Sequence, residues 1–260
     1  MNLQGRVAIV SGGAGHIGSV MAEAIAELGA HVVVLDLDKA RCSEVAKQLV
    51  KDYRVEAMPL PINLAKYEDV RAAAHRVLKH FGRIDVIVNS AALVGTSELK
   101  GWVTPFPEQL PESWRLAMEV NLTAPFFLVQ ACADALEQSG HGSVINIGST
   151  YGVVGPDMRL YNGTRMGNPA AYAASKGGLI QITRWLATVM APKVRVNSIS
   201  FGGMKRGQPS AFQRRYVART PLKRMAIEED AKGAVAFLAS DMSAYVTGHN
   251  LIVDGGWTAW

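Results

Sequence analysis

The chain has 260 residues, of which 49% are hydrophobic and 19% charged, with a formal net charge of +5 and a pI of about 9.2. This length and composition suit one globular domain over 1–260. Two well-separated cysteines, Cys42 and Cys132, exclude a disulfide framework, and we expect no metal site. Because the chain has no long apolar run and no leader-like start, we expect a cytoplasmic protein that does not enter a membrane.

Seven short apolar runs rich in β-branched residues predict strands that are buried on both faces of a parallel sheet. They cover residues 6–10, 31–35, 55–60, 84–88, 143–147, 194–199 and 250–253. The six segments between them, which predict helices, cover residues 17–29, 39–52, 67–81, 112–137, 170–191 and 228–240. This alternation predicts a doubly wound α/β fold with a seven-stranded, mostly parallel sheet and helices on both faces.

The stretch "SGGAGHIG" at 11–18 lies between the first strand and the first helix, as in Rossmann-type folds. There, backbone N–H groups and the positive helix end can bind a pyrophosphate. Gly12 allows the tight turn, and Gly18 allows close packing of helix on strand. With Gly15, these glycines follow a three-residue spacing. His16 starts the helix, either as a tolerated substitution or as an added phosphate contact.

The second predicted strand ends at Asp36, eighteen residues after Gly18. A carboxylate there would accept hydrogen bonds from the adenosine ribose and repel a 2′-phosphate, which favours NAD over NADP. In the alternative interpretation, Asp36 only caps the next helix. Lys39 and Arg41 are close enough in sequence to soften the preference, so NADP stays the second candidate.

Three stretches interrupt the alternation, at about 92–111, 152–169 and 202–222, and each follows a predicted strand. We therefore expect them at the edge of the sheet where ligands bind. The third, extended to residue 225, contains no acidic residue, and its basic residues are Lys205, Arg206, Arg214, Arg215, Arg219, Lys223 and Arg224. Arginine suits phosphate and carboxylate, which favours an anionic substrate. The alternatives are a solvated basic lid and salt bridges to a neighbouring subunit.

Tyr172 and Lys176 stand four residues apart and share one face of the helix predicted at 170–191. Ser149 ends the preceding strand, and Asn121 lies on the helix before it. With these residues the chain resembles the short-chain dehydrogenase/reductase family over essentially its whole length. The matching pieces stand in family order: the glycine loop, Asp36, "NSAA" at 89–92, Asn121, Ser149, Tyr172 with Lys176, "RVNSIS" at 195–200 and "YVTGHNLIVDGG" at 245–256.

The resemblance implies an enzyme that interconverts a secondary alcohol and a ketone by hydride transfer. Tyr172 would be the general acid/base, with its pKa lowered from about 10 by Lys176 and the oxidised nicotinamide. Lys176 would also hold the nicotinamide ribose, and Ser149 would hold the substrate oxygen. Asn121 would help to hold a water that relays protons.

The resemblance also implies a set of cofactor-binding residues, with some departures from the family pattern. The set is Gly12, Gly15, His16, Ile17, Gly18, Asp36, Leu37, Asn63, Leu64, Asn89, Ala91, Tyr172, Lys176 and Gly202. In "NSAA", Ser90 and Ala92 replace a usual asparagine and glycine. Asn63 stands where an aspartate usually contacts adenine, and Phe201 replaces a usual proline. None of these departures removes a catalytic group.

The spacing of 23 residues from Ser149 to Tyr172 is longer than is usual in the family. We expect the extra stretch to open beside the active site, with substrate bound by Ser149, Arg159, Tyr161, Arg165 and Arg206. Some segments also resemble a subgroup associated with bacterial surface-sugar and flagellin modification. We therefore expect an anionic, sugar-like substrate such as a sugar phosphate or nucleotide sugar.

Other functions stay open. A 3-oxoacyl-thioester reductase would use the same chemistry, although such enzymes usually take NADPH. A dinucleotide-sensing protein without catalysis would share the scaffold, but such relatives tend to lose the tyrosine or lysine. No nucleic-acid motif or long basic tail supports nucleic-acid binding. The family implies a homodimer or homotetramer built on the helix at 170–191.

Overall fold

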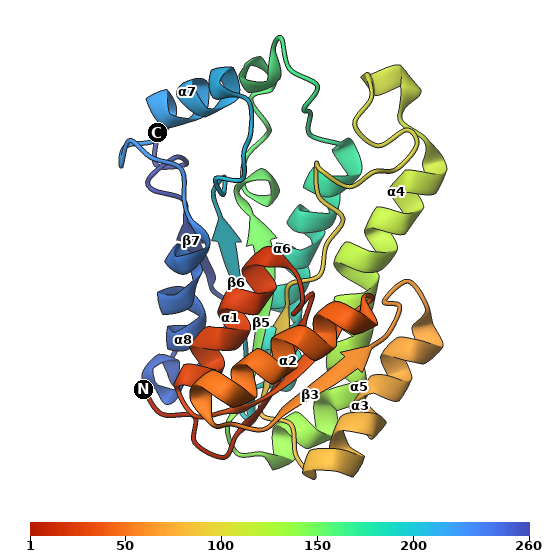
Figure 1. Cartoon of the computed structure of the whole chain (residues 1–260), viewed down its shortest axis with the longest axis vertical. Helices are drawn as coiled ribbons and strands as arrows, with labels where there is room; N and C mark the ends of the chain where they lie inside the picture. The colour runs from red at the N-terminus through yellow and green to blue at the C-terminus, as the bar shows by residue number, and fades with distance from the viewer.

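A computed structural model describes all residues, 1–260, and contains one sheet of seven parallel strands in the order β3-β2-β1-β4-β5-β6-β7 (Figure 1). The strands are β1 Val7–Ser11, β2 His31–Asp36, β3 Ala57–Pro61, β4 Val86–Asn89, β5 Gly142–Ser149, β6 Val194–Phe201 and β7 Asn250–Val253. The predicted doubly wound fold is confirmed. The strand order reverses between β1 and β4, and ligands bind at such a switch point in open α/β sheets.

Eight α-helices and several single turns connect the strands. The helices are α1 His16–Glu27, α2 Lys39–Tyr53, α3 Tyr67–Phe81, α4 Pro111–Met118, α5 Ala124–Gln138, α6 Ala170–Met190, α7 Ser210–Arg219 and α8 Lys232–Ala239. The 3₁₀ turns are η1 Phe106–Glu108, η3 Thr150–Gly152, η4 Met158–Tyr161, η5 Glu228–Ala231 and η6 Asp241–Ser243, and the π-helical turn is η2 Glu119–Thr123.

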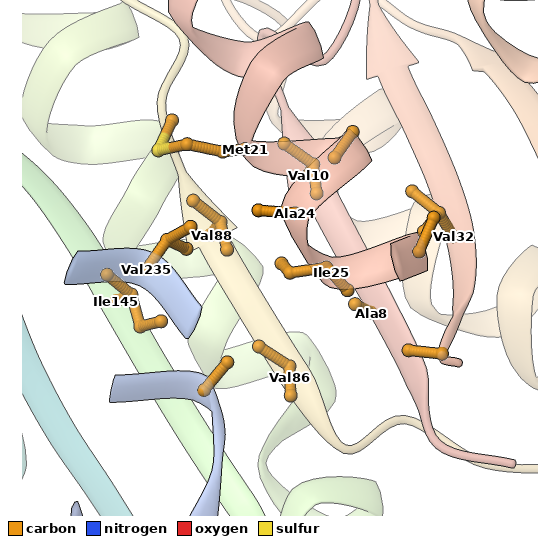
Figure 2. Close-up of a cluster of buried hydrophobic side chains, with 14 of the residues drawn as sticks. Ala8, Val10, Met21, Ala24, Ile25, Val32, Val86, Val88, Ile145 and Val235 are labelled. Atoms are coloured by element: carbon orange, nitrogen blue, oxygen red, sulfur yellow. The ribbon is translucent and has the colours of Figure 1, made fainter. Parts of the chain in front are cut away.

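Side chains that alternate along the buried strands form a core on each face of the sheet, because successive residues of a strand point to opposite sides. Val10 and Val88 pack against Met21 and Ile25 of α1, and Val235 of α8 joins them (Figure 2). The opposite face is covered by α3, α5 and α6. The two apolar layers hold the sheet between them, and because its strands are parallel, their carboxyl ends all lie at one edge.

The segment predicted as one helix at 112–137 is interrupted by the π-helical turn η2. The predicted helix is confirmed as one run from Pro111 to Gln138 that contains this π-helical turn, and Pro125 gives the physical reason for the turn. Proline has no N–H, so it cannot donate to the carbonyl of Asn121 four residues earlier, and the hydrogen-bond pattern changes there. The break puts Asn121, which is fully buried, at an irregular turn that faces the catalytic edge.

The run from Pro111 to Gln138 is long and apolar enough, by length and composition alone, to cross a membrane. In the fold, however, Leu128, Cys132 and Leu136 of this run belong to the core that α5 shares with α3 and the sheet. The run therefore acts as a core helix.

Helix α7 lies inside the stretch predicted as a loop at 202–222, and it packs beside η4 at the edge where the strands end (Figure 1). Its apolar side carries Phe212 and Tyr216, four residues apart, and both are buried with Tyr161 and Trp257. The spacing of these two aromatic residues was a helical signal in the sequence.

Candidate functional site

The glycine loop forms an open cradle at the start of α1. Gly12 has φ +67°, and a Cβ added at Gly18 would run into the Gly12 carbonyl, so neither position accepts a side chain. Gly15 is the N-cap and has no side-chain capping hydrogen bond, which leaves first-turn N–H groups available to an anion. An added Cβ at Gly15 would meet only the Gly12 oxygen. His16 is exposed at the first helical position, with Ile17 after it. The loop fits a pyrophosphate.

Asp36, at the end of β2, lies beside the glycine loop. Its Oδ2 accepts a hydrogen bond from the Ala14 N–H at 3.1 Å, and its Oδ1 accepts one from the N–H of Leu37 at 2.7 Å. Asp38, not Asp36, caps α2, by accepting from two first-turn N–H groups. The capping interpretation of Asp36 is therefore excluded. Arg41 is paired with Glu44 at 2.6 Å, which reduces its availability to a phosphate.

The other predicted cofactor residues follow strand ends along this edge. Asn63 and Leu64 come after β3, and the Asn63 Oδ1 accepts from the Ala65 N–H, which leaves its amide hydrogens for a ligand. Asn89 ends β4. A Cβ added at Gly12 would lie 2.7 Å from the Ala91 backbone, so the chain after β4 presses against the glycine loop.

Gly202 follows β6, and its N–H donates to the Val253 carbonyl at 3.0 Å. A Cβ added there would lie 2.9 Å from the Asp254 Cα and 3.0 Å from the Tyr216 hydroxyl. Glycine is therefore needed where the chain crosses the end of β7.

Ser149, Tyr172 and Lys176 converge where β5 meets the first turns of α6. Ser149 is the last residue of β5, and Tyr172 and Lys176 lie one turn apart on α6. Lys176 is 2% exposed, and its Nζ donates to the Ile147 carbonyl at 2.7 Å and lies 5.9 Å from the centroid of the Tyr172 ring. The predicted catalytic groups thus come from two elements and meet at one point.

Burial raises the pKa of Tyr172, while the Ser149 hydroxyl and the positive charge of Arg206 act to lower it. Burial also lowers the pKa of Lys176 to about 8. Without cofactor the Tyr172 pKa is therefore raised, whereas the expected lowering depends on the oxidised nicotinamide as well as on Lys176. The reason is desolvation, which disfavours both the phenolate and the ammonium. A lowered phenol pKa requires a further positive charge, such as the oxidised nicotinamide.

The Asn121 side chain joins three segments of the site. Its Oδ1 accepts from the Leu93 N–H at 2.7 Å, and its Nδ2 donates to the Leu93 carbonyl and to the Ser175 Oγ, both at 3.1 Å. Ser175 in turn donates to the Tyr172 carbonyl at 2.9 Å. Both amide hydrogens are therefore used within the protein. The side chain ties the loop after β4 to the catalytic helix, and Pro125 leaves the Asn121 carbonyl without its usual helical donor.

The stretch at 152–169, called the insertion from here on, is held to α7 by a salt bridge. Asp157 is paired with both Arg159 and Arg219, and hydrogen bonds from Arg159 contribute most to lowering its pKa to about 2. The Arg159 side chain is 82% exposed, so its guanidinium is engaged at the outer surface of the insertion. Arg165 is exposed. Neither arginine is brought to the catalytic groups by any contact in the structure.

Three of the seven basic residues of the third loop are paired with acidic residues from outside it. Arg206 pairs with Glu228 at 2.9 Å and Arg224 pairs with Asp230 at 2.6 Å. These pairs lie within the chain, and they reduce the charge that the loop can offer to an anionic substrate. Arg206 is the basic residue of the loop whose positive charge acts to lower the pKa of Tyr172.

Sequence reasoning missed three polar residues of this region, which are Tyr151, Asn168 and Ser175. The Tyr151 and Tyr161 hydroxyls are 2.9 Å apart. Hydrogen bonding from the Asn168 side chain acts to lower the pKa of Tyr161, which burial raises. Tyr151 stands only two residues after Ser149, which was the available signal. For Asn168 the sequence carries no comparable signal.

Comparison with known proteins agrees with this geometry. Residues 12–258 match a family model described as enoyl-(acyl carrier protein) reductase. The chain is 32% identical to trans-4-hydroxycyclohexanecarboxylate dehydrogenase from Sinomonas cyclohexanicum, over 98% of this chain and 93% of that protein. It is 31% identical to the 3-oxoacyl-(acyl-carrier-protein) reductase FabG of Escherichia coli, over 98% of each. The structure of a gluconate 5-dehydrogenase from Burkholderia cenocepacia, in complex with NADP and tartrate, has a TM-score of 0.87 at 29% identity and covers 100% of this chain and 97% of that one.

Proposed function

We propose, from the premise that this chain belongs to the short-chain dehydrogenase/reductase family and is an NAD(P)-dependent oxidoreductase acting on CH–OH groups, that it uses NAD to interconvert a secondary alcohol and a ketone in a polar, anionic, sugar-like substrate. The observation that carries the reaction is the meeting of Ser149, Tyr172 and Lys176 at the end of β5. The choice of NAD as the cofactor rests on the position of Asp36 beside the glycine loop.

Bound NAD supplies the hydride acceptor. In alcohol oxidation, the substrate loses a hydride from carbon and a proton from oxygen, and Tyr172 takes the proton. The Ser149 hydroxyl holds the same oxygen, and Lys176 keeps a buried positive charge 5.9 Å from the tyrosine ring, which favours the phenolate. Asn121 and Ser175 fix the catalytic helix against the loop after β4.

Arg206 supports an anionic substrate, because its positive charge acts to lower the pKa of Tyr172. Its Nε donates to Glu228, and its two terminal nitrogens, which bond no protein atom, can bind a carboxylate or phosphate. Two of the related proteins are named for substrates that carry a carboxylate, a hydroxycyclohexanecarboxylate and gluconate. A 3-oxoacyl-thioester reductase is the second candidate, supported by the likeness to FabG. Asp36 argues against its usual cofactor, NADPH.

The substrate class is tested with purified enzyme, NAD, and a panel of sugar phosphates, nucleotide sugars, sugar acids, an acyl thioester and neutral alcohols, with NADH absorbance as the readout. Turnover of the anionic sugar compounds above the neutral alcohols supports the proposal. Turnover confined to uncharged alcohols contradicts it, and NADPH-dependent reduction of the thioester alone favours the second candidate.

Replacing Asp36 by Asn should shift cofactor preference towards NADP. The amide no longer repels a 2′-phosphate and is a weaker acceptor for ribose hydroxyls, and loss of a charge-assisted hydrogen bond of this kind costs on the order of 1.5–3 kcal/mol. We expect the ratio of kcat/KM for NAD to that for NADP to fall by about 10- to 100-fold. Asp38→Asn, at the neighbouring helix cap, is the control. An unchanged ratio in Asp36→Asn would remove the basis for NAD.

The exposed side of α6 supports a homodimer. Trp185 and Val189 are 53% and 58% exposed, and the Trp185 ring lies 6.1 Å from that of Phe126 on α5. Such a patch on two packed helices suits a self-complementary contact. We expect Trp185→Asp to reduce the molar mass measured by light scattering, whereas Val50→Asp on α2 should not. A wild-type monomer would contradict this assignment.

A further inference from the structure

Two tyrosine hydroxyls meet above the end of β5. Tyr151 lies in η3, two residues after Ser149, and Tyr161 lies in η4 of the insertion. Their hydroxyl oxygens are 2.9 Å apart, and the Tyr151 N–H donates to the Ser149 Oγ at 3.2 Å. The pair therefore borders the place where the substrate oxygen meets Ser149 and Tyr172.

In this cluster the hydroxyl hydrogen of Tyr151 and the amide oxygen of Asn168 bond no protein atom. The two hydroxyls carry two hydrogens, and their mutual hydrogen bond uses one; no protein acceptor takes the other. The Asn168 side chain also acts on the Tyr161 hydroxyl, and its Oδ1 is buried without any hydrogen-bond partner. Buried polar atoms are nearly always paired, so the Asn168 Oδ1 calls for a donor, and the remaining Tyr151 hydroxyl hydrogen can meet an acceptor. A hydroxyl group, which both donates and accepts, satisfies both.

The cluster is rigidly supported. Tyr161 is 8% exposed and packs on Phe212 of α7, with ring centroids 5.3 Å apart. Tyr151 makes an edge contact with Trp257, which stacks on Tyr216. Rings held by such packing keep their hydroxyls in fixed positions, which is what selective recognition of a polar group requires.

We propose that Tyr151, Tyr161 and Asn168 form a subsite for a second hydroxyl of the substrate, close to the carbon that reacts. The enzyme is then selective for polyhydroxylated compounds over simple alcohols. This inference rests on the proposed function and adds a recognition element to the same site. It assigns the extra residues between Ser149 and Tyr172 a role in substrate selection.

The test compares 2,3-dihydroxybutanoate with 3-hydroxybutanoate, each with NAD, because the two differ only in the second hydroxyl. We expect wild-type kcat/KM to favour the dihydroxy compound by about 10-fold or more. Tyr151→Phe and Asn168→Ala, which remove the Tyr151 hydroxyl and the Asn168 amide, should each reduce this preference by about 10-fold. Tyr216→Phe is the matched control, because its hydroxyl bonds the Gly203 N–H at 2.6 Å and should leave the preference intact.

The outcomes separate this inference from the proposed function. If the wild type oxidises both compounds with equal efficiency, or if both variants lose activity on the two compounds in equal proportion, the subsite is overturned and the function stands. If the wild type oxidises neither these compounds nor any member of the wider panel, both are overturned. Thermal unfolding of each variant identifies a loss of activity that comes from unfolding.

Discussion

Replacing Tyr172 by Phe should lower kcat for alcohol oxidation by about 10²- to 10⁴-fold, the range expected for loss of a general acid/base. The ring is packed against the small core around Trp102, and Phe preserves that packing. The affinity for NAD, measured by quenching of tryptophan fluorescence, should therefore change little. Because burial raises the tyrosine pKa, we also expect the wild-type oxidation rate to increase towards alkaline pH.

The control for this result is Tyr216→Phe, which removes a phenol hydroxyl that bonds only the Gly203 N–H. A Tyr172→Phe variant with normal turnover would show that another group moves the proton. Equal losses in both variants would show that the tyrosines act through the structure instead.

Replacing Lys176 by Met should abolish efficient turnover and at the same time remove an energetic burden from the folded state. The pKa of this buried lysine falls from 10.5 to about 8. Below pH 8 the ammonium is present in both the folded and unfolded chain, and its burial disfavours the folded one by about 3 kcal/mol. Leaving the Ile147 carbonyl without its donor costs about 1–3 kcal/mol in the variant, so the net gain at pH 7 is about 0–2 kcal/mol.

The pH dependence of that difference is the decisive measurement. Between pH 8 and 10.5 the unfolded chain still binds the proton and the folded chain has lost it, so wild-type stability rises with pH. The advantage of Lys176→Met in the free energy of unfolding should therefore decline by about 3 kcal/mol across this window. Denaturant unfolding at pH 7 and pH 10 measures it, with exposed Lys205→Met as the control. A difference independent of pH would contradict the buried charge.

The parts of the fold that sequence reasoning predicted are those set by local patterns. Continuous β-branched runs predicted all seven strands, and the glycine spacing at Gly12, Gly15 and Gly18 predicted the loop before α1. The lysine and tyrosine on α6 were predicted to share a face by their four-residue spacing. In each case one short segment contains the whole signal.

The parts that were missed depend on contacts between distant segments. The partners of Arg206 and Arg219 are Glu228 and Asp157, which lie outside the basic loop, so the loop alone indicated more uncompensated charge than the protein has. The direction of the Tyr172 pKa follows from burial, which no local pattern reveals. Pro125 was the signal for the π-helical turn within the helix Pro111–Gln138, but the apolar run around it concealed the change of hydrogen bonding.

Three contacts join the insertion after β5 to helix α7. Asp157 pairs with Arg219, and the rings of Tyr161 and Phe212 pack together. Arg215 donates hydrogen bonds to the carbonyls of Leu160 and Asn162. These two segments are far apart in the chain but form one cap over the site. Natural variation in this protein should therefore change them together. Grafting a different substrate preference would require exchanging both segments as a pair, since exchanging either alone would break the contact between Asp157 and Arg219.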